Sequence, residues 1–234
     1  MKKQKEVVLA FADPHAPFHH PDTLEFLKAV KKKYQPTQVV CLGDEIDLHS
    51  VSFHDHSPDN LSAGEELKEA VAFMKQLYKI FPNVKSCISN HTSLPFRKAY
   101  AYGIPKELIK DYKDFLSAPD GWSWADSWIV DGVQYQHGTG YSGLSGHNKA
   151  ALGNMRSTVI GHLHSNFTIT FHANSEKLIF GACIGCLIDD SAYSFEYNKN
   201  FVRKPIIGCA IVDGGVPTLI PMLLSKRSRW VGVL

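Results

Sequence analysis

Val39-Val40-Cys41-Leu42-Gly43-Asp44-Glu45-Ile46-Asp47 joins an apolar, β-branched run to a turn that carries carboxylates. A run of this kind is typical of a buried strand. Asp44 and Asp47 follow where that strand should end. In an open α/β sheet, functional sites form outside the carboxyl ends of the strands. The stretch therefore predicts an α/β sheet with a site at its carboxyl edge.

Four more motifs with histidine or aspartate occur in the chain, and three of them also follow apolar runs. The additional motifs are Asp13-Pro14-His15, Asn90-His91, His137-Gly138 and Gly161-His162-Leu163-His164. The runs are residues 7–12, 84–89 and 158–160, and the shorter stretch 133–136 precedes His137. Metal-binding and acid–base side chains are thus predicted to gather at strand ends, as in a two-metal hydrolase.

The composition is that of an ordinary globular protein. The chain has 234 residues, 44% apolar and 21% charged, and we expect one domain over residues 1–234. A net charge of +2 neither implies nor excludes a nucleic-acid partner. No apolar run approaches the roughly 20 residues that a membrane span needs, so no membrane partner is expected. Residues 7–12 are too short for a signal-peptide core, and a cytoplasmic protein is expected.

The cysteine pattern allows two interpretations. Cys183-Ile184-Gly185-Cys186 has the spacing of a redox pair or of half a zinc site. No second pair of this spacing follows, and the surrounding run is apolar, so a buried strand is favoured. Five cysteines used in this way fit a reducing compartment.

The order of elements predicts parallel strands followed by a strand-rich half. We expect helices over residues 22–34, 63–81 and 105–116, the second capped by Ser62 and Glu65. Seven strands are expected in the second half, at 127–130, 133–137, 158–161, 167–171, 178–182, 206–212 and 217–223. Asp131-Gly132 and residues 213–215 predict tight turns. The picture is two facing sheets flanked by helices.

Four segments allow both a functional and a structural interpretation. The polar loop 48–61, with His49, His54, Asp55 and His56, should border the site. The Trp-rich stretch 122–128 is interpreted as an edge strand or a packed loop rather than a substrate platform. The glycine-rich loop 138–146 could bind an anion or only connect two elements. The basic segment 226–230 is expected to be a solvated tail rather than a phosphate contact.

The spacing of the motifs suggests which side chains share a ligand. Asp13 and His15 are two positions apart, as are His162 and His164, and in extended backbone such pairs point the same way. Adjacent residues point apart, so we expect His91 to face the substrate as an acid rather than join Asn90 on an ion. Asp44 can bridge two cations.

The donor set suggests the kind of ion. Nitrogen and oxygen ligands without thiolate suit Mn²⁺, Fe, Zn²⁺ or Ni²⁺ better than Mg²⁺ or Ca²⁺. Asp47 lies beyond the strand end and is expected to orient a histidine rather than to bind an ion.

Taken in order, the motifs closely resemble those of the calcineurin-like metallophosphoesterases, over Asp13 to His164. The resemblance implies an α/β fold of four αββα layers, in which two mixed β-sheets are flanked by helices, the metallo-dependent phosphatase fold. It implies two divalent metal ions, with Mn²⁺ favoured. One would be held by Asp13, His15, Asp44 and His164, and the other by Asp44, Asn90, His137 and His162. It also implies that His91 is the catalytic acid and that Asp47 orients it.

Two departures from the family pattern concern the substrate. Ser89 and Thr92 flank Asn90-His91 where the family often has Gly and an acid, and Leu48 follows Asp47 where phosphoprotein phosphatases have Arg. The second change argues against a Ser/Thr phosphoprotein phosphatase. Arg97 is the candidate substrate-binding cation, with Lys98 beside it.

The expected activity is hydrolysis of a phosphoester by a hydroxide that bridges two metals, with His91 assisting the leaving group. A phosphodiesterase or nuclease-like enzyme is favoured, and its substrate is a phosphoester such as a nucleotide or nucleic acid. The alternatives are a phosphomonoesterase acting on a small molecule and a non-catalytic scaffold of the same fold. The sequence predicts no oligomeric state.

Overall fold

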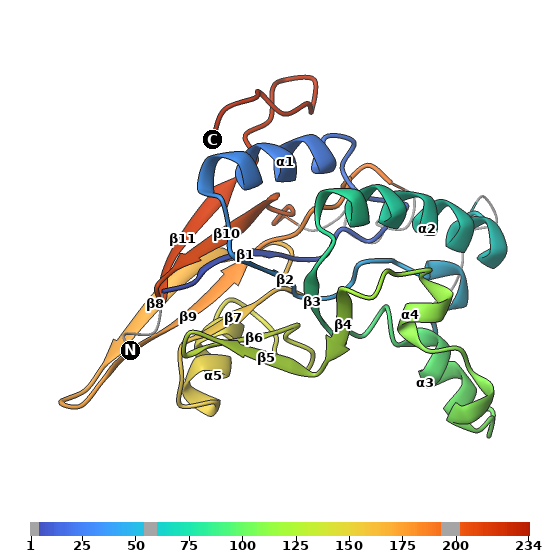
Figure 1. Cartoon of the computed structure of the whole chain (residues 1–234), viewed down its shortest axis with the longest axis horizontal. Coiled ribbons are helices and arrows are strands. Elements are labelled where there is room, and N and C mark those ends of the chain that lie inside the picture. Colours follow the sequence, from blue (N-terminus) through green and yellow to red (C-terminus); the bar gives the residue numbers. More distant parts are fainter. Residues whose placement is uncertain (1–4, 54–59, 193–201) are drawn as a thin grey trace.

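Two mixed β-sheets form the centre of the molecule. The computed structural model describes residues 5–53, 60–192 and 202–234. The first sheet has six strands in the order β11-β10-β1-β2-β3-β4, and β1 to β4 are parallel while β10 and β11 are antiparallel to their neighbours (Figure 1). Its strands are β1 (Val7–Phe11), β2 (Gln38–Cys41), β3 (Val84–Cys87), β4 (Trp122–Ala125), β10 (Gly208–Asp213) and β11 (Val216–Pro221).

The second sheet has five strands in the order β5-β6-β7-β9-β8. Strands β6, β7 and β9 are parallel, and the outer strands β5 and β8 run antiparallel to them. Its strands are β5 (Ser127–Val130), β6 (Val133–Gln136), β7 (Thr158–Ile160), β8 (Phe167–Ala173) and β9 (Leu178–Ile184). The strands expected in the second half of the sequence are therefore confirmed, with ends that differ by a few residues.

Helices cover the outer faces of both sheets, which gives the four expected layers. Helices α1 (Thr23–Tyr34) and α2 (Ala63–Ile80) lie over the first sheet, and α5 (Gly146–Gly153) lies against β7 and β9 (Figure 1). Helices α3 (Leu94–Ala101) and α4 (Tyr112–Phe115) lie beyond β4. Among the described residues, no helix is long and apolar enough to cross a membrane.

Strand alternation explains how β1 serves two cores. Leu9 and Phe11 are buried against the apolar faces of α1 and α2, whereas Val8 and Ala10 are buried between the two sheets. Successive side chains of a strand point to opposite faces, so a strand buried on both sides reads as one continuous apolar run. The run that precedes Asp13 in the sequence is therefore a central strand.

The ends of α2 follow the sequence signals. Ser62 and Glu65 form the expected capping box, in which each side chain accepts from the backbone N–H of the other.

The helix predicted over residues 105–116 is wrong. The chain forms a short 3₁₀ turn at Lys106–Leu108, then α4. Residues 101–108 are exposed, so no packed apolar face stabilises a longer helix there.

The predicted tight turns are confirmed, because Asp131-Gly132 joins β5 to β6 and residues 214–215 join β10 to β11. The Trp-rich stretch forms β4 and the start of β5, each at the edge of a sheet. Cys183 lies in β9 and Cys186 just beyond its end, and both are buried free thiols.

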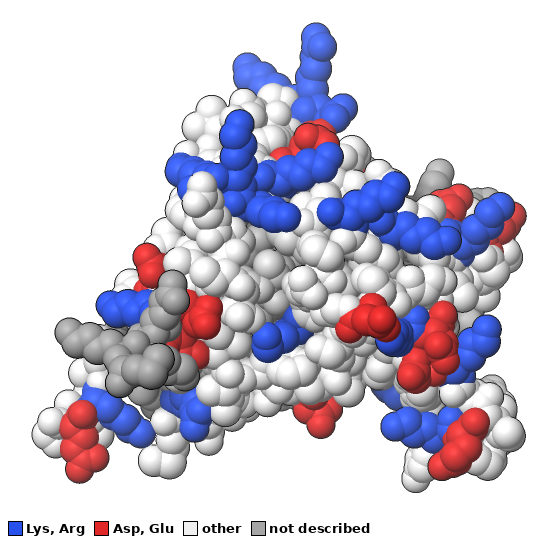
Figure 2. Space-filling model, in the orientation of Figure 1, with Lys and Arg blue, Asp and Glu red and all other residues white. Residues whose placement is uncertain are grey.

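The prediction of a solvated C-terminal tail is wrong for Trp230, which is half-buried, whereas Arg229 is exposed but paired with Asp22. Nε of Arg229 donates to the Asp22 carboxylate at 2.8 Å, and the Trp230 ring packs edge-on against Phe26. Lys226 and its neighbour Arg227 are exposed, as expected. Lys and Arg side chains gather along this part of the surface, over α1 and the C-terminal segment (Figure 2).

Candidate metal centre

The five motifs meet where the carboxyl ends of both sheets face each other. Asp13 and His15 follow β1, Asp44 follows β2, and Asn90 and His91 follow β3. From the second sheet, His137 follows β6, and His162 and His164 follow β7. Asp13, His15, Asp44 and His137 are each at most 2% exposed. The structure thus brings every predicted metal-site residue to one place, from segments that lie far apart in the sequence.

The spacing of the motif residues suggested an extended backbone, but the backbone of these motifs is not extended. Asp13, His15, Asp44 and His162 adopt the left-handed region, with φ between 48° and 66°. This region is costly for residues other than glycine and persists where surrounding structure enforces it. The carboxylate of Asp13 meets the backbone N–H of His162 at 2.9 Å, and the N–H of Asp13 donates to the Gly43 carbonyl. Such bonds tie the motifs to one another.

The side chains form two groups that are joined by Asp44. Asp13, His15 and His164 offer ligand atoms within 4.8 Å of one another, and so do Asp44, His137 and His162. His15, Asp44 and His91 meet the same distance, so His91 also lies within reach of an ion beside His15 and Asp44. Oδ2 of Asp44 lies 3.5 Å from Nε2 of His15 and 3.3 Å from Nε2 of His137. His162 and His164 therefore belong to different groups, contrary to the expectation that residues two apart serve one pocket.

The ring nitrogens are arranged as in metal-binding histidines. Nδ1 of His137 donates to the Leu42 carbonyl at 2.9 Å, and Nδ1 of His15 donates to Asp47 at 2.6 Å. These bonds leave Nε2 of each ring for the site, which is the usual role of a partner on the far nitrogen.

The groups fit two divalent cations. Nε2 of His15 and Nε2 of His164 face each other at 3.2 Å, and Oδ1 of the buried Asp13 carboxylate has no hydrogen-bond partner among the described residues. Nε2 of His137 and Oδ1 of Asn90 are 2.7 Å apart. Nitrogens and oxygens that face one another in this way, without a thiolate, match the ligand preferences of Mn²⁺, Zn²⁺ and related ions.

Asp47 connects the first group to His91. Its Oδ1 accepts from His15 and lies 3.2 Å from Nδ1 of His91, which also donates to the Asp47 backbone carbonyl at 2.7 Å. The backbone N–H of His91 donates to Oδ1 of Asp44 at 3.0 Å. His91 is therefore held by both carboxylates of the Asp44–Asp47 turn.

The electrostatics distinguish His91 from the histidines of the two groups. Burial lowers the pKa of His91, but Asp44 and Asp47 outweigh burial and raise it to about 10. Burial, together with the other imidazoles, lowers the pKa of His162 to about 4 and that of His164 well below its usual range. Burial would raise the pKa of Asp44, yet His137 and His91 hold it well below normal.

A buried glutamate beside Asp44 was not predicted from the sequence. Glu45 is fully buried and accepts from Thr92 Oγ1 at 2.6 Å, from Trp124 Nε1 at 2.8 Å and from the hydroxyl of Ser86. Thr92 immediately follows Asn90-His91, so Glu45 ties that turn to the Asp44 turn. No local pattern reveals this role, because the donors come from three distant segments.

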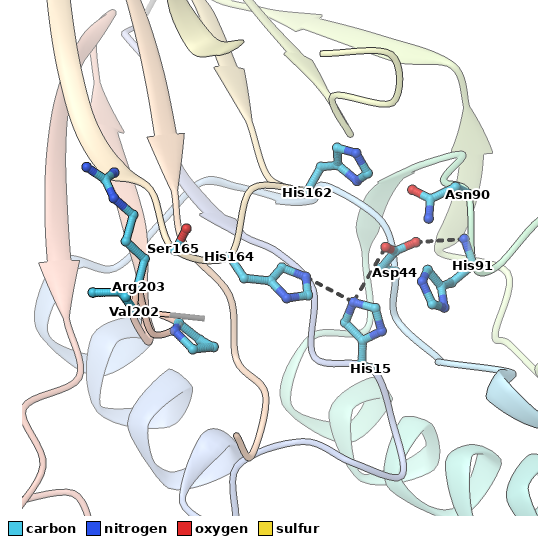
Figure 3. Close-up of a pocket in the computed structure, with 10 residues that line it drawn as sticks. His15, Asp44, Asn90, His91, His162, His164, Ser165, Val202 and Arg203 are labelled. Atoms are coloured by element: carbon cyan, nitrogen blue, oxygen red, sulfur yellow. Dashed lines mark hydrogen bonds and ion pairs between the residues drawn. The ribbon is translucent and has the colours of Figure 1, made fainter. Parts of the chain in front are cut away.

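The site opens into a cavity of about 600 Å³. His15, Asp44, His91 and His164 line it, together with Asn90, His162, Ser165, Val202, Arg203 and Pro205 (Figure 3). Arg203 lies on the opposite side of this cavity from His91 (Figure 3). Arg203 belongs to no sequence motif, and its place at the site was not predicted.

Arg97, the predicted substrate-binding residue, lies outside this cavity. Its Nη1 donates to the backbone carbonyl of Asn90 at 3.0 Å, and its guanidinium lies 5.4 Å from the Phe53 ring centroid. In the predicted glycine-rich loop, Oγ1 of Thr139 lies 3.4 Å from Oδ1 of Asn90. In the polar loop, Glu66 accepts from the backbone N–H of His49 at 2.7 Å. His54, Asp55 and His56 lie outside the described residues.

Comparison with known proteins identifies the family. The sequence model of the calcineurin-like phosphoesterases matches residues 7–176, and the chain belongs to this family. The two mixed sheets with flanking helices are the metallo-dependent phosphatase fold. No curated protein matches the sequence.

Several solved structures are similar to this chain at low sequence identity. Yfce, a phosphoesterase from E. coli, is 13% identical with a TM-score of 0.46, and the match covers 96% of each chain. A metallophosphoesterase from Sphaerobacter thermophilus is 13% identical, covers 94% of this chain and 89% of its own, and has a TM-score of 0.44. Vacuolar Protein Sorting 29 from Cryptosporidium parvum is 13% identical, covers 96% and 100%, and has a TM-score of 0.44.

Proposed function

We propose that this protein is a phosphodiesterase that uses two divalent metal ions, with Mn²⁺ as the favoured ion. The observation that carries the proposal is the pair of ligand groups that share Asp44 beside a histidine held by Asp44 and Asp47. Family membership supports phosphoester hydrolysis in general.

The residues of each metal position follow from the two groups. Asp13, His15, Asp44 and His164 would hold one ion; Asp44, Asn90, His137 and His162 would hold the other. When bound, two such ions polarise a phosphoryl oxygen and lower the pKa of water, which provides a nucleophile at neutral pH.

His91 is proposed to donate a proton to the leaving oxygen. Its Nδ1 is engaged by the carbonyl of Asp47, so Nε2 is the nitrogen left for a substrate in the cavity that the ring lines. The hydrogen bonds of Nδ1 with Asp47 favour the protonated ring, which can give up a proton from Nε2. Asp47 is proposed to orient both His91 and His15, because the same carboxylate oxygen, Oδ1, contacts both rings.

The cations near the cavity favour a diester. Leu48 is buried and brings no positive charge to the position after Asp47. Arg203, at the far side of the cavity from His91, is the cation that we propose to contact the substrate there, and Arg97 remains a proposed contact beyond Asn90. A terminal phosphate carries one more negative charge than a diester, so an uncharged Leu48 and a single arginine in the described lining of the cavity favour the diester. A phosphomonoesterase is the alternative.

Hydrolysis of bis-p-nitrophenyl phosphate and of p-nitrophenyl phosphate, each with Mn²⁺, Zn²⁺ or Ni²⁺, tests the proposal. We expect turnover of the diester and a lower kcat/KM for the monoester. His91→Ala should lower kcat by about 100-fold, a typical contribution of a general acid, while two equivalents of metal stay bound. His172→Ala, a histidine of β8 outside the site, is the matched control and should keep wild-type turnover.

Two results would redirect the proposal. A faster monoester reaction would favour the phosphomonoesterase. Absence of turnover with all three ions, together with less than one equivalent of bound metal, would support the non-catalytic scaffold.

The cytoplasmic location is also a proposal. The five cysteines are buried free thiols, and such usage is typical of a reducing compartment.

A further inference from the structure

A second hollow lies beside the metal centre. It has a volume of about 480 Å³ and lies between the chain after η1 (His49–Val51) and helix α3. Its lining is aromatic and basic, and consists chiefly of Phe53, Phe96, Arg97, Tyr100, Ile104 and Lys106. We call this hollow the aromatic groove.

The aromatic groove adjoins the catalytic cavity through one residue pair. Arg97 lines the groove, and its Nη1 donates at 3.0 Å to the carbonyl of Asn90, which lines the cavity. Phe53 lies just beyond the turn that carries Asp47. A ligand long enough to leave the cavity past Asn90 therefore meets the groove next.

The groove exposes two aromatic rings, those of Phe53 and Tyr100, to solvent. Tyr100 is 87% exposed and Phe53 is 52% exposed. Grouped apolar exposure of this kind is typical of a binding surface, whereas single exposed residues are common. The rings are therefore a candidate stacking surface.

Cations lie over these same rings. Nζ of Lys98 is 4.1 Å from the Phe53 centroid, and the Arg97 guanidinium is 5.4 Å from it. Lys106 lies 5.9 Å from the Phe96 ring. Among the described residues, no carboxylate lines the groove, although Glu107 and Asp111 occur in the following segment. The groove thus combines ring faces with positive charge and suits a ligand that has both flat rings and negative charge.

The denser basic surface over α1 is a weaker candidate for such a ligand (Figure 2). Lys28 is paired with Glu25, and Nζ of Lys31 donates to the Ile80 carbonyl. Nζ of Lys33 donates to the carbonyl of Leu234. These lysines are engaged within the protein, as Arg97 is by the Asn90 carbonyl, but α1 differs from the groove because it exposes no large apolar side chain.

We propose that the aromatic groove binds a single-stranded nucleic acid, so that the substrate class of the neighbouring site is a single-stranded polynucleotide. Unstacked bases would lie on Phe53 and Tyr100, and backbone phosphates would contact Arg97 and Lys106. Proteins that bind single strands without sequence preference combine these two features, ring faces and a basic path. The inference rests on the proposed phosphodiesterase function, because the scissile phosphate would then lie in the cavity beside Asn90.

Fluorescence anisotropy of a labelled dT₁₂ strand with the full-length protein in EDTA tests the groove separately from hydrolysis. We expect Phe53→Ala and Tyr100→Ala each to weaken binding fivefold or more, the lower end of what one stacked base contributes. Tyr102→Ala is the matched control, since Tyr102 is 78% exposed and two residues away but does not line the groove. It should bind as the wild type does.

The salt dependence tests the phosphate contacts. Each phosphate of a single strand that a protein cation neutralises adds about 0.7 to the slope of log Kd against log salt concentration. The double variant R97Q/K106Q removes two such cations, so its slope should be about 1.4 smaller than that of the wild type. Thermal melting of every variant checks that the fold is kept, and a variant that melts early is replaced by Phe53→Leu or Tyr100→Leu, which keep bulk without a ring.

Three results would overturn the proposal: no binding of dT₁₂, equal weakening by Tyr100→Ala and Tyr102→Ala, or displacement of the strand by an acidic peptide at a lower concentration than by unlabelled dT₁₂. Failure of the phosphodiesterase proposal looks different. In that case bis-p-nitrophenyl phosphate is not hydrolysed while dT₁₂ still binds to the groove.

Discussion

Replacement of Glu45 offers the sharpest test of how the two turns of the site are held together. Glu45 is fully buried between Asp44 and Ile46, and three donors point at its carboxylate. Two are buried hydroxyls, of Ser86 and Thr92, and the third is the indole N–H of Trp124. Glu45→Ala removes the acceptor of all three, whereas Glu45→Gln keeps the shape of the side chain.

The two variants should differ strongly in stability. A buried donor left without a partner costs about 1–3 kcal/mol, and a hydroxyl recovers part of this when it turns to another acceptor. With the cavity left by the side chain, we expect Glu45→Ala to lower the free energy of unfolding by about 4 kcal/mol. In Glu45→Gln the amide oxygen can still accept from Trp124 and Ser86, and the amide nitrogen can donate to Thr92. The loss of charge assistance should then cost only about 1 kcal/mol.

Urea unfolding in EDTA, followed by tryptophan fluorescence, measures both variants without a contribution from bound metal. The midpoint should fall in the order wild type, Glu45→Gln, Glu45→Ala, with an unchanged m-value. Glu107→Ala replaces an exposed glutamate and should stay within about 0.5 kcal/mol of the wild type. Equal stability of Glu45→Ala and Glu45→Gln would refute the reasoning, because the three donors would then not depend on this side chain.

Three further variants test other parts of the structure. Asp47→Asn should lower turnover of bis-p-nitrophenyl phosphate about 10–100-fold, because outer carboxylates orient ligand and catalytic histidines; unchanged kcat and metal content would contradict the orienting role. Gly43→Ala should lower the free energy of unfolding in urea by more than about 3 kcal/mol, since φ is +98° and the new Cβ would lie 2.5 Å from Cβ of Ser89. Gly103→Ala is the control: its φ is +69° but the space around it is open, so it should cost about 1 kcal/mol. Burial, then the charge of His20, lowers the pKa of His19 to about 4. In the unfolded chain His19 takes up a proton below about pH 6.5, whereas in the folded protein it stays neutral until about pH 4. The contribution of neutral His19 to the stability of the fold is therefore complete above about pH 6.5 and is lost as the pH falls below it. From pH 7 to 5 the wild type should lose about 2 kcal/mol more than His19→Gln in urea unfolding; identical pH profiles would rule this out.

Local patterns were sufficient to predict where the strands end. The predicted runs gave β1, β2, β3 and β7 to within two residues, because strands in the middle of a sheet that is covered on both faces are mainly apolar. The sequence of β3 is less uniform, since it contains Lys85 and the buried Ser86. Since the carboxyl ends of neighbouring parallel strands meet at one edge, the motif residues could be expected to assemble. Their roles on metal or substrate, and a single domain over residues 1–234, stay predictions.

Features that depend on distant segments could not be predicted. Arg203 reaches the cavity from a chain segment that follows β9, and no spacing connects it to His164. The left-handed backbone at Asp13 and Asp44 is enforced by hydrogen bonds between motifs, so the rule for extended strands does not hold there. Arg229 and Trp230 looked like a free tail because their partners, Asp22 and Phe26, are near the other end of the sequence.

The place of β1 has a consequence for synthesis of the chain on the ribosome. One edge of β1 pairs with β2, which emerges soon after it, but the other pairs with β10 (Gly208–Asp213). At about 5–20 residues per second, β10 is made roughly 10–40 s after β1. Until then the first sheet, which carries Asp13, Asp44 and Asn90, has an unpaired edge along β1, a template for association with other chains. Chaperone protection during translation should therefore matter more for this protein than for one whose central strand pairs early.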